Sequence, residues 1–425
     1  MVWTERFARQ VITMDEAVRL VRSGDRVMGG MPEPAQFLEV LAARDDLRGV
    51  ELFLTAPRSG GVAVAENPGI TLFAGFLTDA TRTSQAAFEV LPVHFSGTQG
   101  FIRRWNPRVR VVLIGEPTDD GVVYPGSTVA NDDDLVNGPR SDDSVVIGIV
   151  DANQPRLRGH TLRVEQFDAL VELPDDAPPP FYDPRRVSAH VDAFVAAIDE
   201  LIPDGATMQS GVGGLPEAII ARLGHKQDLG VHTEVMGWGM AQLIASGAVT
   251  NCRKSHFPGE SIYTIAMPET VPVLLADPMA RIERASIVLD SREIAKNSTL
   301  RCVNAVLQFD LLGQGNAEMI EGVQYSGVGG QLDFLRACTM ADEALSILVL
   351  ESTAAAGTIS RIVPNLGRNA TTGGRYETQV VVTEYGLAWL RDASMRQKAQ
   401  QLIAIAHPAH RDRLTYDARA EGLLL

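Results

Sequence analysis

The segment DGATMQSGVGGLPEAIIARLGHKQDLGVHTEVMGWG, residues 204–239, carries the pattern that decides the fold. It reads as a short strand, a glycine turn, a helix, a loop and a second strand, with Glu234 at the end of that second strand. Pro216 follows the turn at a position where helices begin, and the turn itself needs small residues. The residues of the turn are Gly211, Val212, Gly213, Gly214 and Leu215.

A glycine turn that leads into a helix points unpaired backbone N–H groups, and the positive end of a dipole, at whatever binds there. A phosphate or a developing oxyanion suits such a turn, and Glu234 nearby is a candidate nucleophile or base. The alternative is purely structural, because glycine-rich turns between strands and helices occur throughout α/β proteins.

The composition is that of a globular protein with room for two or three domains. The chain has 425 residues, of which 45% are hydrophobic and 21% charged. Its formal net charge of -15 disfavours nucleic acid and anionic membranes as partners. No apolar run approaches the ~18 residues of a membrane span, and the first residues lack the apolar core of a secretion signal.

The cysteines and histidines predict neither a disulfide framework nor a metal site. Cys252, Cys302 and Cys338 lie far apart, without CxxC spacing, which favours a reducing cytoplasm. His407 and His410 lack a nearby acidic or cysteine partner, so we expect structural roles for both.

The first half of the chain repeats the pattern of the central segment. Residues 23–53 and 203–234 share the order turn, strand, glycine turn, proline, helix, Asp-Leu, strand. Before the first copy, Thr13 and Glu16 form a capping-box pattern for a helix over residues 13–23. We interpret the repeat as an internal duplication, in which Phe53 lies opposite Glu234 and only the second half offers a carboxylate.

The rest of the chain alternates strands and helices, which predicts an α/β fold with mostly parallel sheets. Residues 115–143 read as an acidic loop, and the proline-rich residues 172–186 as a linker. We therefore expect an N-terminal domain over 1–175, a linker over 176–187 and a catalytic domain over 188–425. The predicted strands are 50–54, 109–114, 145–150, 261–266, 271–275, 303–310, 346–350 and 380–383, and the predicted helices 36–43, 190–201, 241–246 and 395–406.

A second turn of the same kind, Ser326 to Gly330, precedes a helix that runs through Cys338. Neither turn completes G-x-G-x-x-G, and the sequence lacks G-x-x-x-x-G-K-[ST] and G-x-S-x-G, which disfavours dinucleotide, nucleotide triphosphate and serine hydrolase chemistry. A carboxylate nucleophile fits better. Attack of Glu234 on a thioester gives a mixed anhydride and a thiolate, and the thiolate can return to leave the glutamate as a thioester.

Five ordered motifs resemble the acetyl-CoA hydrolase/transferase family, which includes 4-hydroxybutyrate CoA-transferase and succinyl-CoA:acetate CoA-transferase. The similarity is strong over residues 205–410 and weaker in the first half. The motifs are GVGGLPEAI…LGHKQDLGVHTE, SGVGGQLDFLRA, TISRIVP, VVVTEYGLAWLR and LIAIAHPAHRDRL.

The resemblance implies two related CoA-transferase-type (NagB/RpiA-like) domains and ping-pong exchange of coenzyme A without a permanently bound cofactor or metal. Its implied partners are an acyl-CoA, a small carboxylic acid and a second copy of the chain in a homodimer. The family's thioester-forming glutamate matches Glu234. Its CoA contacts match the turn from Gly211 to Leu215, together with Leu307 and Gly330.

Two departures from the family pattern concern substrate binding. Relatives usually read Ser-Asp-Gly where this chain has Gly237-Trp238-Gly239, and they carry a lysine near residues 352–357 that this chain lacks. Lys254 or Arg361 is a candidate replacement for that lysine.

Three alternatives to a CoA-transferase remain open at this point. They are an acyl-CoA hydrolase on the same site, a non-catalytic CoA-binding protein and, more distantly, a Rossmann oxidoreductase.

Overall fold

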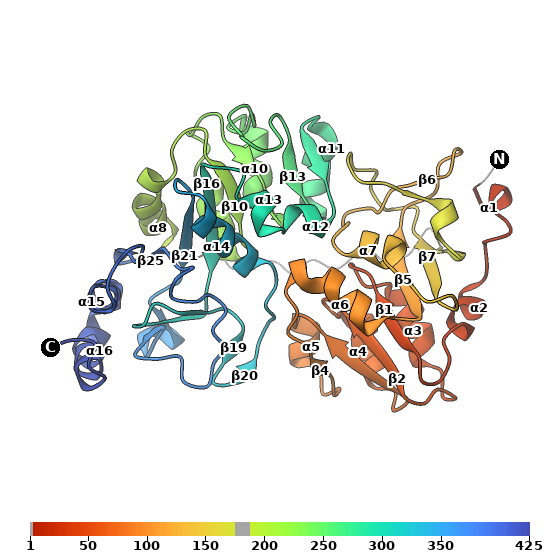
Figure 1. The fold of residues 1–425 in the computed structure, drawn as a ribbon, viewed down its shortest axis with the longest axis horizontal. Coiled ribbons are helices and arrows are strands. Elements are labelled where there is room, and N and C mark those ends of the chain that lie inside the picture. Colours follow the sequence, from red (N-terminus) through yellow and green to blue (C-terminus); the bar gives the residue numbers. More distant parts are fainter. Residues whose placement is uncertain (1–2, 175–187) are drawn as a thin grey trace. The chain divides into compact units, whose positions relative to one another are not determined.

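The computed structural model describes residues 3–174 and 188–425, which form two compact units (Figure 1). Unit 1 consists of Met1–Tyr182, Thr264–Val271 and Arg281–Ile287, and unit 2 of the remainder. Two short segments from the second half of the sequence therefore belong to unit 1. The predicted linker over 176–187 lies outside the described residues.

Unit 1 is built on a seven-stranded sheet in the order β4-β3-β2-β1-β5-β7-β9, with every neighbouring pair parallel. These strands are β1 Arg26–Gly29, β2 Val50–Leu54, β3 Ile70–Ala74, β4 Glu89–Val90, β5 Val109–Ile114, β7 Val145–Val150 and β9 Ala169–Glu172; the short pair β6 Val122–Val123 and β8 Leu162–Arg163 lies apart. The helices of this part are α1 Trp3–Arg6, α2 Met14–Arg19, α3 Ala35–Ala42, α4 Ser59–Ala65, α5 Asp79–Thr83, α6 Thr98–Trp105 and α7 Asp132–Asn137.

Successive side chains of the unit 1 strands enter two separate apolar clusters, because side chains alternate along a strand. Val27 and Leu52 join a cluster with α2, α3 and α4, whereas Met28 and Phe53 join a cluster with α6 and α7. Both faces of the sheet are thus covered, as the β-branched runs of its strands indicate.

Unit 2 is built on a six-stranded sheet in the order β11-β10-β16-β21-β25-β26. Only the edge pair β25 and β26 is antiparallel. Its strands are β10 Thr207–Ser210, β11 Gly230–Val231, β16 Leu300–Ala305, β21 Leu345–Val349, β25 Val380–Thr383 and β26 Gly386–Trp389.

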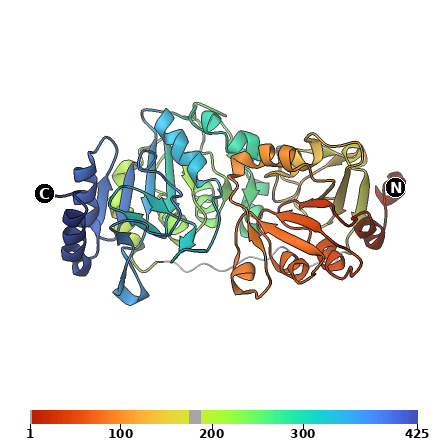
Figure 2. The ribbon, with the colours of Figure 1, turned by 60° about the horizontal axis from the view of Figure 1, so that its bottom comes forward.

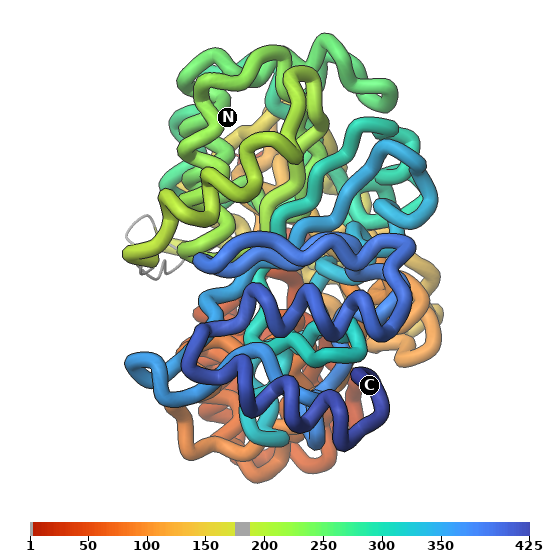
Figure 3. The backbone as a smooth tube through the Cα atoms, turned by 90° about the vertical axis from the view of Figure 1, so that its left-hand side faces the viewer, coloured from red at the N-terminus to blue at the C-terminus, as the bar shows by residue number. Residues whose placement is uncertain are grey.

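In the second half of the chain, α8, α9, α14 and α15 pack on strands of this sheet, and α15 and α16 lie side by side at the end of the chain (Figures 2 and 3). The helices are α8 Val191–Ile198, α9 Gly214–Ala221, α10 Trp238–Ser246, α11 Val271–Ala276, α12 Ala285–Val288, α13 Ser291–Ile294, α14 Gln331–Met340, α15 Met395–Ile405 and α16 Pro408–Ala420. The short strands are β12 Val235–Met236, β13 Ser261–Tyr263, β14 Ile265–Ala266, β15 Ala280–Ile282, β17 Gln308–Asp310, β18 Gly315–Asn316, β19 Met319–Ile320, β20 Val323–Gln324, β22 Thr353–Ala354, β23 Ile359–Ser360 and β24 Ile362–Val363.

The two sheets share one strand order, which supports the predicted duplication. The run β2-β1-β5-β7-β9 in unit 1 corresponds to β11-β10-β16-β21-β25 in unit 2, and all of these pairs are parallel. The predicted α/β class with mostly parallel sheets is confirmed.

The predicted register of the repeat, with Phe53 opposite Glu234, is wrong by two residues. In unit 1 Arg26 pairs with Glu51, and in unit 2 Thr207 pairs with Gly230. Counting along each strand from these pairs places Thr55 opposite Glu234. The same offset in residue number aligns the first residue of α4 with the first residue of α10. The segment that connects the two paired strands is two residues shorter in unit 2 than in unit 1. The equivalent bonds across that loop are Gly24 N–H to Arg48 C=O in unit 1 and Gly205 N–H to Gln227 C=O in unit 2.

The predicted acidic loop over 115–143 is wrong in part, because its centre forms the buried helix α7. Asp133 is 5% exposed and contacts His160 at 3.0 Å and Arg284 at 3.2 Å. Asp132 accepts the N–H of Met31 at 3.1 Å. Distant residues thus compensate carboxylates that look like a solvated loop in the sequence.

Three predicted strands of the second half differ from the structure, and one helix is additional. The predicted strand over 261–266 is divided into β13 and β14, which belong to different sheets. Residues 271–275 form helix α11, with Pro272 in its first turn where its missing N–H is harmless. The predicted strand over 303–310 is broken, because β16 and β17 belong to different sheets and Leu307 lies between them. Helix α16 was not expected; the side chain of His407 caps it by accepting the N–H of Ala409 at 3.2 Å.

Unit 1 holds the segment 281–287 through a close backbone contact at Gly159. A Cβ at this position would lie 2.1 Å from the carbonyl oxygen of Ile282, and the residue has φ +136°. We expect Gly159→Ala to lower the free energy of unfolding by about 2–4 kcal/mol in a denaturant titration. Gly24→Ala, with φ +82° but no atom within 4 Å, is the matched control and should cost about 1 kcal/mol. Equal losses in the two variants would contradict this packing.

Candidate active site

Glu234 lies at a bend between β11 and β12 in unit 2, just past the carboxyl end of the sheet strand. The two residues before it are fully buried and tied to the strands on either side. The N–H of His232 donates to the carbonyl of Met208 at 3.1 Å, and the N–H of Thr233 donates to that of Ile262 at 3.0 Å. The main chain that carries the carboxylate is therefore fixed.

The carboxyl group of Glu234 rests on Gly330, the residue that precedes α14. A Cβ at position 330 would lie 2.2 Å from Glu234 Oε2 and 2.9 Å from a methyl carbon of Leu289. Because even one extra carbon would strike the carboxylate, glycine is required here for contact rather than for a special backbone angle. The N–H of Gly330 donates to this carboxylate.

The surroundings of Glu234 favour its neutral form. Burial and, to a lesser extent, the negative charge of Asp333 raise its pKa, the Gly330 N–H lowers it, and together they set the pKa at about 8. Asp333 lies in the first turn of α14, is 2% exposed, and donates its N–H to the carbonyl of Gly330 at 3.1 Å. Glu234 keeps partial exposure, so the group is desolvated but reachable.

His232 is a neutral structural residue rather than a proton donor. It is fully buried, and that burial lowers its pKa to about 3, with the charge of Lys254 acting in the same direction. Its Nε2 lies 3.0 Å from the carbonyl of Val288, and its Nδ1 lies 3.2 Å from Nδ2 of Asn297. Since the amide can only donate, Nε2 carries the proton, and the ring anchors the segment whose Leu289 packs beside Gly330.

The first glycine turn lies beside the segment that carries Glu234. Thr233 Oγ1 donates to the carbonyl of Ser210 at 3.3 Å, directly before the turn. Gly211 packs against Asn304, whose Oδ1 would lie 2.5 Å from a Cβ there, while Val212 is 54% exposed. The turn is therefore held from behind by a buried amide and open on its outer side.

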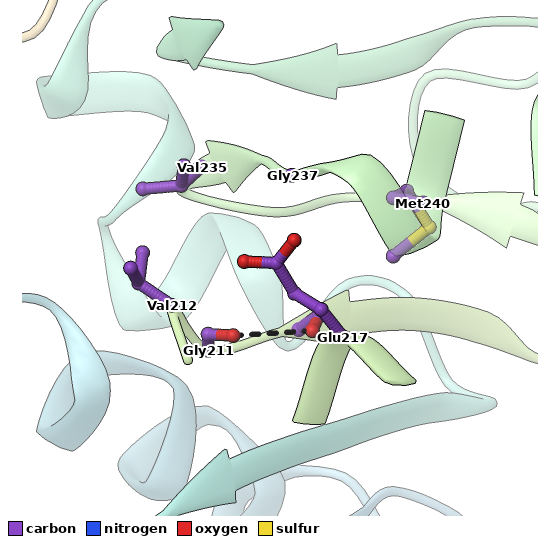
Figure 4. A pocket seen from close by; sticks show the side chains of 7 residues that line it. Gly211, Val212, Glu217, Val235, Gly237 and Met240 are labelled. Atoms are coloured by element: carbon purple, nitrogen blue, oxygen red, sulfur yellow. Dashed lines mark hydrogen bonds between the residues drawn. The ribbon is translucent and has the colours of Figure 1, made fainter. Parts of the chain in front are cut away.

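A small hollow separates this turn from β12 and α10 (Figure 4). The carboxyl group of Glu217 points into it, between Val235, Gly237 and Met240. Glu217 Oε2 accepts the N–H of Trp238 at 2.9 Å, and a Cβ at Gly237 would lie 2.6 Å from the same oxygen. Gly237 thus serves the packing of α10 on α9, and Trp238 is the first residue of α10.

The remaining predicted binding residues lie at different places in unit 2. Leu307 follows the end of β16, which neighbours β10, and its N–H donates to the carbonyl of Asn316 at 2.7 Å. Lys254 is buried, and its Nζ donates to the carbonyls of Val231 at 2.8 Å and Glu260 at 2.5 Å. It is therefore not free to bind a phosphate.

Of the two candidate replacements for the missing lysine, Arg361 is more available to bind a phosphate than Lys254. It is partly exposed, and its guanidinium makes no hydrogen bond or ion pair with the part of the chain that the structure describes.

The sequence reasoning missed four residues of the site. Asp333 carried a signal, since it is an acidic residue in the first turn of the helix that follows a glycine turn. No sequence signal pointed to the other three residues, because each contacts the site through a residue that is distant in the sequence. These residues are Leu289, Asn297 and Glu217.

The described residues contain neither a membrane-spanning helix nor a cluster of metal ligands. No helix there combines the length and apolar character needed to cross a membrane, and no group of three metal-binding side chains occurs among residues 3–174 and 188–425.

A pH titration of stability tests the environment of Glu234. The folded-state pKa of about 8 lies above the unfolded value near 4.5, so stability falls as the pH rises from 4.5 to 8. We expect Glu234→Gln to be more stable than the wild type, by on the order of 2 kcal/mol at pH 8 and by little at pH 4.5. Melting temperatures across this range measure the difference, with exposed Glu343→Gln as the control. A constant offset between Glu234→Gln and wild type would refute the buried, destabilised carboxylate.

Comparison with known proteins identifies the family. The acetyl-CoA hydrolase/transferase C-terminal domain matches residues 271–418. The succinyl-CoA:cyclohexane-1-carboxylate CoA transferase of Geobacter metallireducens is 32% identical, over 98% of this chain and 97% of that protein. The 4-hydroxybutyrate coenzyme A transferase of Clostridium kluyveri is 31% identical, over 97% of this chain and 98% of that protein.

The fold agrees with the sequence comparison. The crystal structure of RipA from Yersinia pestis superposes with a TM-score of 0.90 at 29% identity, and the match covers 100% of both chains. The protein thus belongs to the acetyl-CoA hydrolase/transferase family and is a CoA-transferase.

Proposed function

We propose that this CoA-transferase moves coenzyme A between an acyl-CoA and a small carboxylic acid through a thioester on Glu234. The observation that carries the proposal is the Glu234 carboxylate, desolvated yet reachable, against the backbone of Gly330. A carboxylate that water no longer solvates fully is a stronger nucleophile toward a thioester carbonyl.

The reaction balances in two half-cycles. The Glu234 carboxylate attacks the acyl carbon, and the C–S bond breaks, giving an acyl-glutamyl anhydride and CoA thiolate. The thiolate then attacks the glutamyl carbonyl, giving glutamyl-CoA and the free acid. A second acid reverses both steps, leaves as the new acyl-CoA and restores the carboxylate.

The tetrahedral intermediates need a hydrogen-bond donor, and the N–H of Gly330 is the nearest candidate. It already donates to the Glu234 carboxylate, so it can follow the oxygen as negative charge develops. His232 takes no part in proton transfer, because it stays neutral over the working pH range and both ring nitrogens are engaged.

The coenzyme contacts the turn from Gly211 to Leu215, Leu307 and Gly330, in this proposal. The outer side of the turn is solvent-exposed, as a binding surface requires. Arg361 serves the phosphates in place of the missing lysine, since Lys254 is engaged with backbone carbonyls. We also propose that the protein acts as a homodimer in the cytoplasm, as the resemblance to the family implies.

Acyl-CoA hydrolysis is the second candidate, favoured by the partial exposure of Glu234. A water molecule that reaches the glutamyl-CoA thioester would release CoA without an acceptor acid. Measuring CoA exchange with and without an added acid separates the two activities.

The deciding experiment is intact-mass analysis after mixing with acetyl-, butyryl- and succinyl-CoA. We expect an adduct of CoA on the peptide that contains Glu234, lost in Glu234→Ala. Gly330→Ala should reduce adduct formation at least about 100-fold, because its methyl group displaces the carboxylate by more than an ångström. Adduct formation on another peptide, or a Gly330→Ala variant with wild-type rates, would contradict the proposed site.

The pH dependence of the first half-cycle follows from the pKa of Glu234. Only the ionised carboxylate attacks, and the ionised fraction rises about tenfold per pH unit below the pKa of about 8. We expect the rate of adduct formation at low acyl-CoA to rise from pH 6 to pH 8 and then level off. Asp333→Asn should move this rise to lower pH; rapid-quench mass analysis measures both profiles. A flat profile between pH 6 and 8 would show that the attacking group is already ionised.

A further inference from the structure

The side chain of Gln331, the residue after Gly330, carries a buried amide nitrogen that has no partner among the described residues. Nε2 of Gln331 is shielded from solvent and forms no hydrogen bond, and among the described residues of unit 2 it is the only buried side-chain amide nitrogen in that state. Leaving such a donor unpaired is unfavourable, so its retention needs an explanation.

The position of Gln331 relates this donor to the reaction. Gln331 is the first residue of α14 and follows Gly330, on which the Glu234 carboxylate rests. The same helical turn carries Asp333, whose negative charge raises the pKa of Glu234. The amide thus lies at the start of the helix that forms one wall of the nucleophile's site.

Other buried amides in unit 2 show what a structural role looks like. Gln209 and Asn304 exchange two hydrogen bonds, at 3.1 and 2.8 Å. Gln379 donates to the carbonyl of Cys338 at 3.1 Å and accepts the N–H of Ser346 at 2.9 Å. Each of these amides is satisfied by the fold, whereas the Gln331 nitrogen is left for a ligand.

We infer that Gln331 Nε2 donates to a carboxylate oxygen of the acid that leaves, and later enters, at Glu234. This inference rests on the proposed function. The acid is the one reactant that carries negative charge next to Glu234 in the glutamyl-CoA state, and a neutral amide donor can bind it without neutralising the nucleophile. Water carries no such charge, so the amide assists transfer to an acid and leaves hydrolysis unaffected. Gln331 is then a substrate-binding residue that favours transfer over hydrolysis.

Gln331→Met tests the inference, because methionine keeps the length of the side chain and removes the donor. Wild type and variant are loaded to glutamyl-CoA with the acyl-CoA that reacts fastest in the mass assay. Propanoate is then added at rising concentrations, and loss of the adduct is followed with and without it. We expect transfer to propanoate to fall about 10- to 100-fold with unchanged hydrolysis. The melting temperature should stay the same or rise, since no internal bond is lost.

Gln379→Met is the matched control, an amide of the same unit whose bonds are internal. It should lose several degrees in melting temperature and keep the wild-type ratio of transfer to hydrolysis. An unchanged ratio in Gln331→Met, or a loss of stability like that of Gln379→Met, would overturn the role of Gln331 while leaving the thioester route intact. No adduct in the wild type would instead overturn the thioester route, and the role of Gln331 with it.

Discussion

The contact between the Glu234 carboxylate and Gly330 is the constraint on which the proposed active site depends. It places a carboxyl group where burial and the charge of Asp333 both disfavour ionisation, with a backbone N–H as the compensating donor. A carboxylate in water would be more stable and less reactive. The fold therefore retains a group whose burial is unfavourable at neutral pH, and the proposed role of Glu234 as the nucleophile explains its retention.

The frame around this contact is rigid because it is built from neutral, satisfied groups. His232 is held between Val288 and Asn297, and its main chain is part of the bridge to Met208. A charged histidine there would need a buried counter-ion and would change the field at the nucleophile. A neutral ring in one tautomer fixes the segment beside Gly330 without adding charge. The pKa of Glu234 is therefore shifted by burial, Asp333 and the Gly330 N–H, with no opposing charge from the histidine.

The sequence could predict what depends on neighbours along the chain. The strands Val50–Leu54, Val109–Ile114 and Val145–Val150 have the predicted bounds, because runs of β-branched residues identify buried strands locally. The capping box at Thr13 and the glycine turn before α14 are equally local, and both are present. The prediction that Glu234 is the nucleophile likewise depends on the order of motifs around it along the chain.

What the sequence could not predict depends on contacts between distant residues. The sequence around α7 resembles an acidic loop, because no residue near Asp133 in the sequence indicates that Arg284 is its ion-pair partner. The break at Leu307 follows from β17 pairing with β24, a strand far along the chain. The predicted register of the repeat is wrong by two residues because the connecting loop is shorter in unit 2. The two motifs are short and already aligned with a gap, so the sequence does not show where the missing residues lie.

The duplication distinguishes two glutamates of unit 2, Glu217 with a structural role and Glu234 with the proposed chemical role. Glu217 accepts the N–H of Trp238 at the N-terminus of α10, and in unit 1 Glu33 does the same for α4, where it accepts the N–H groups of Gly60 and Gly61. A carboxyl cap on this helix is thus common to both units and belongs to the fold. Glu234 has no such counterpart, since Thr55 occupies the matching position, so its role cannot be one that every copy of the fold requires. In unit 1 the carboxylate of Glu33 satisfies the first amides of α4, whereas unit 2 carries the proposed nucleophile Glu234 in addition to its helix-capping glutamate.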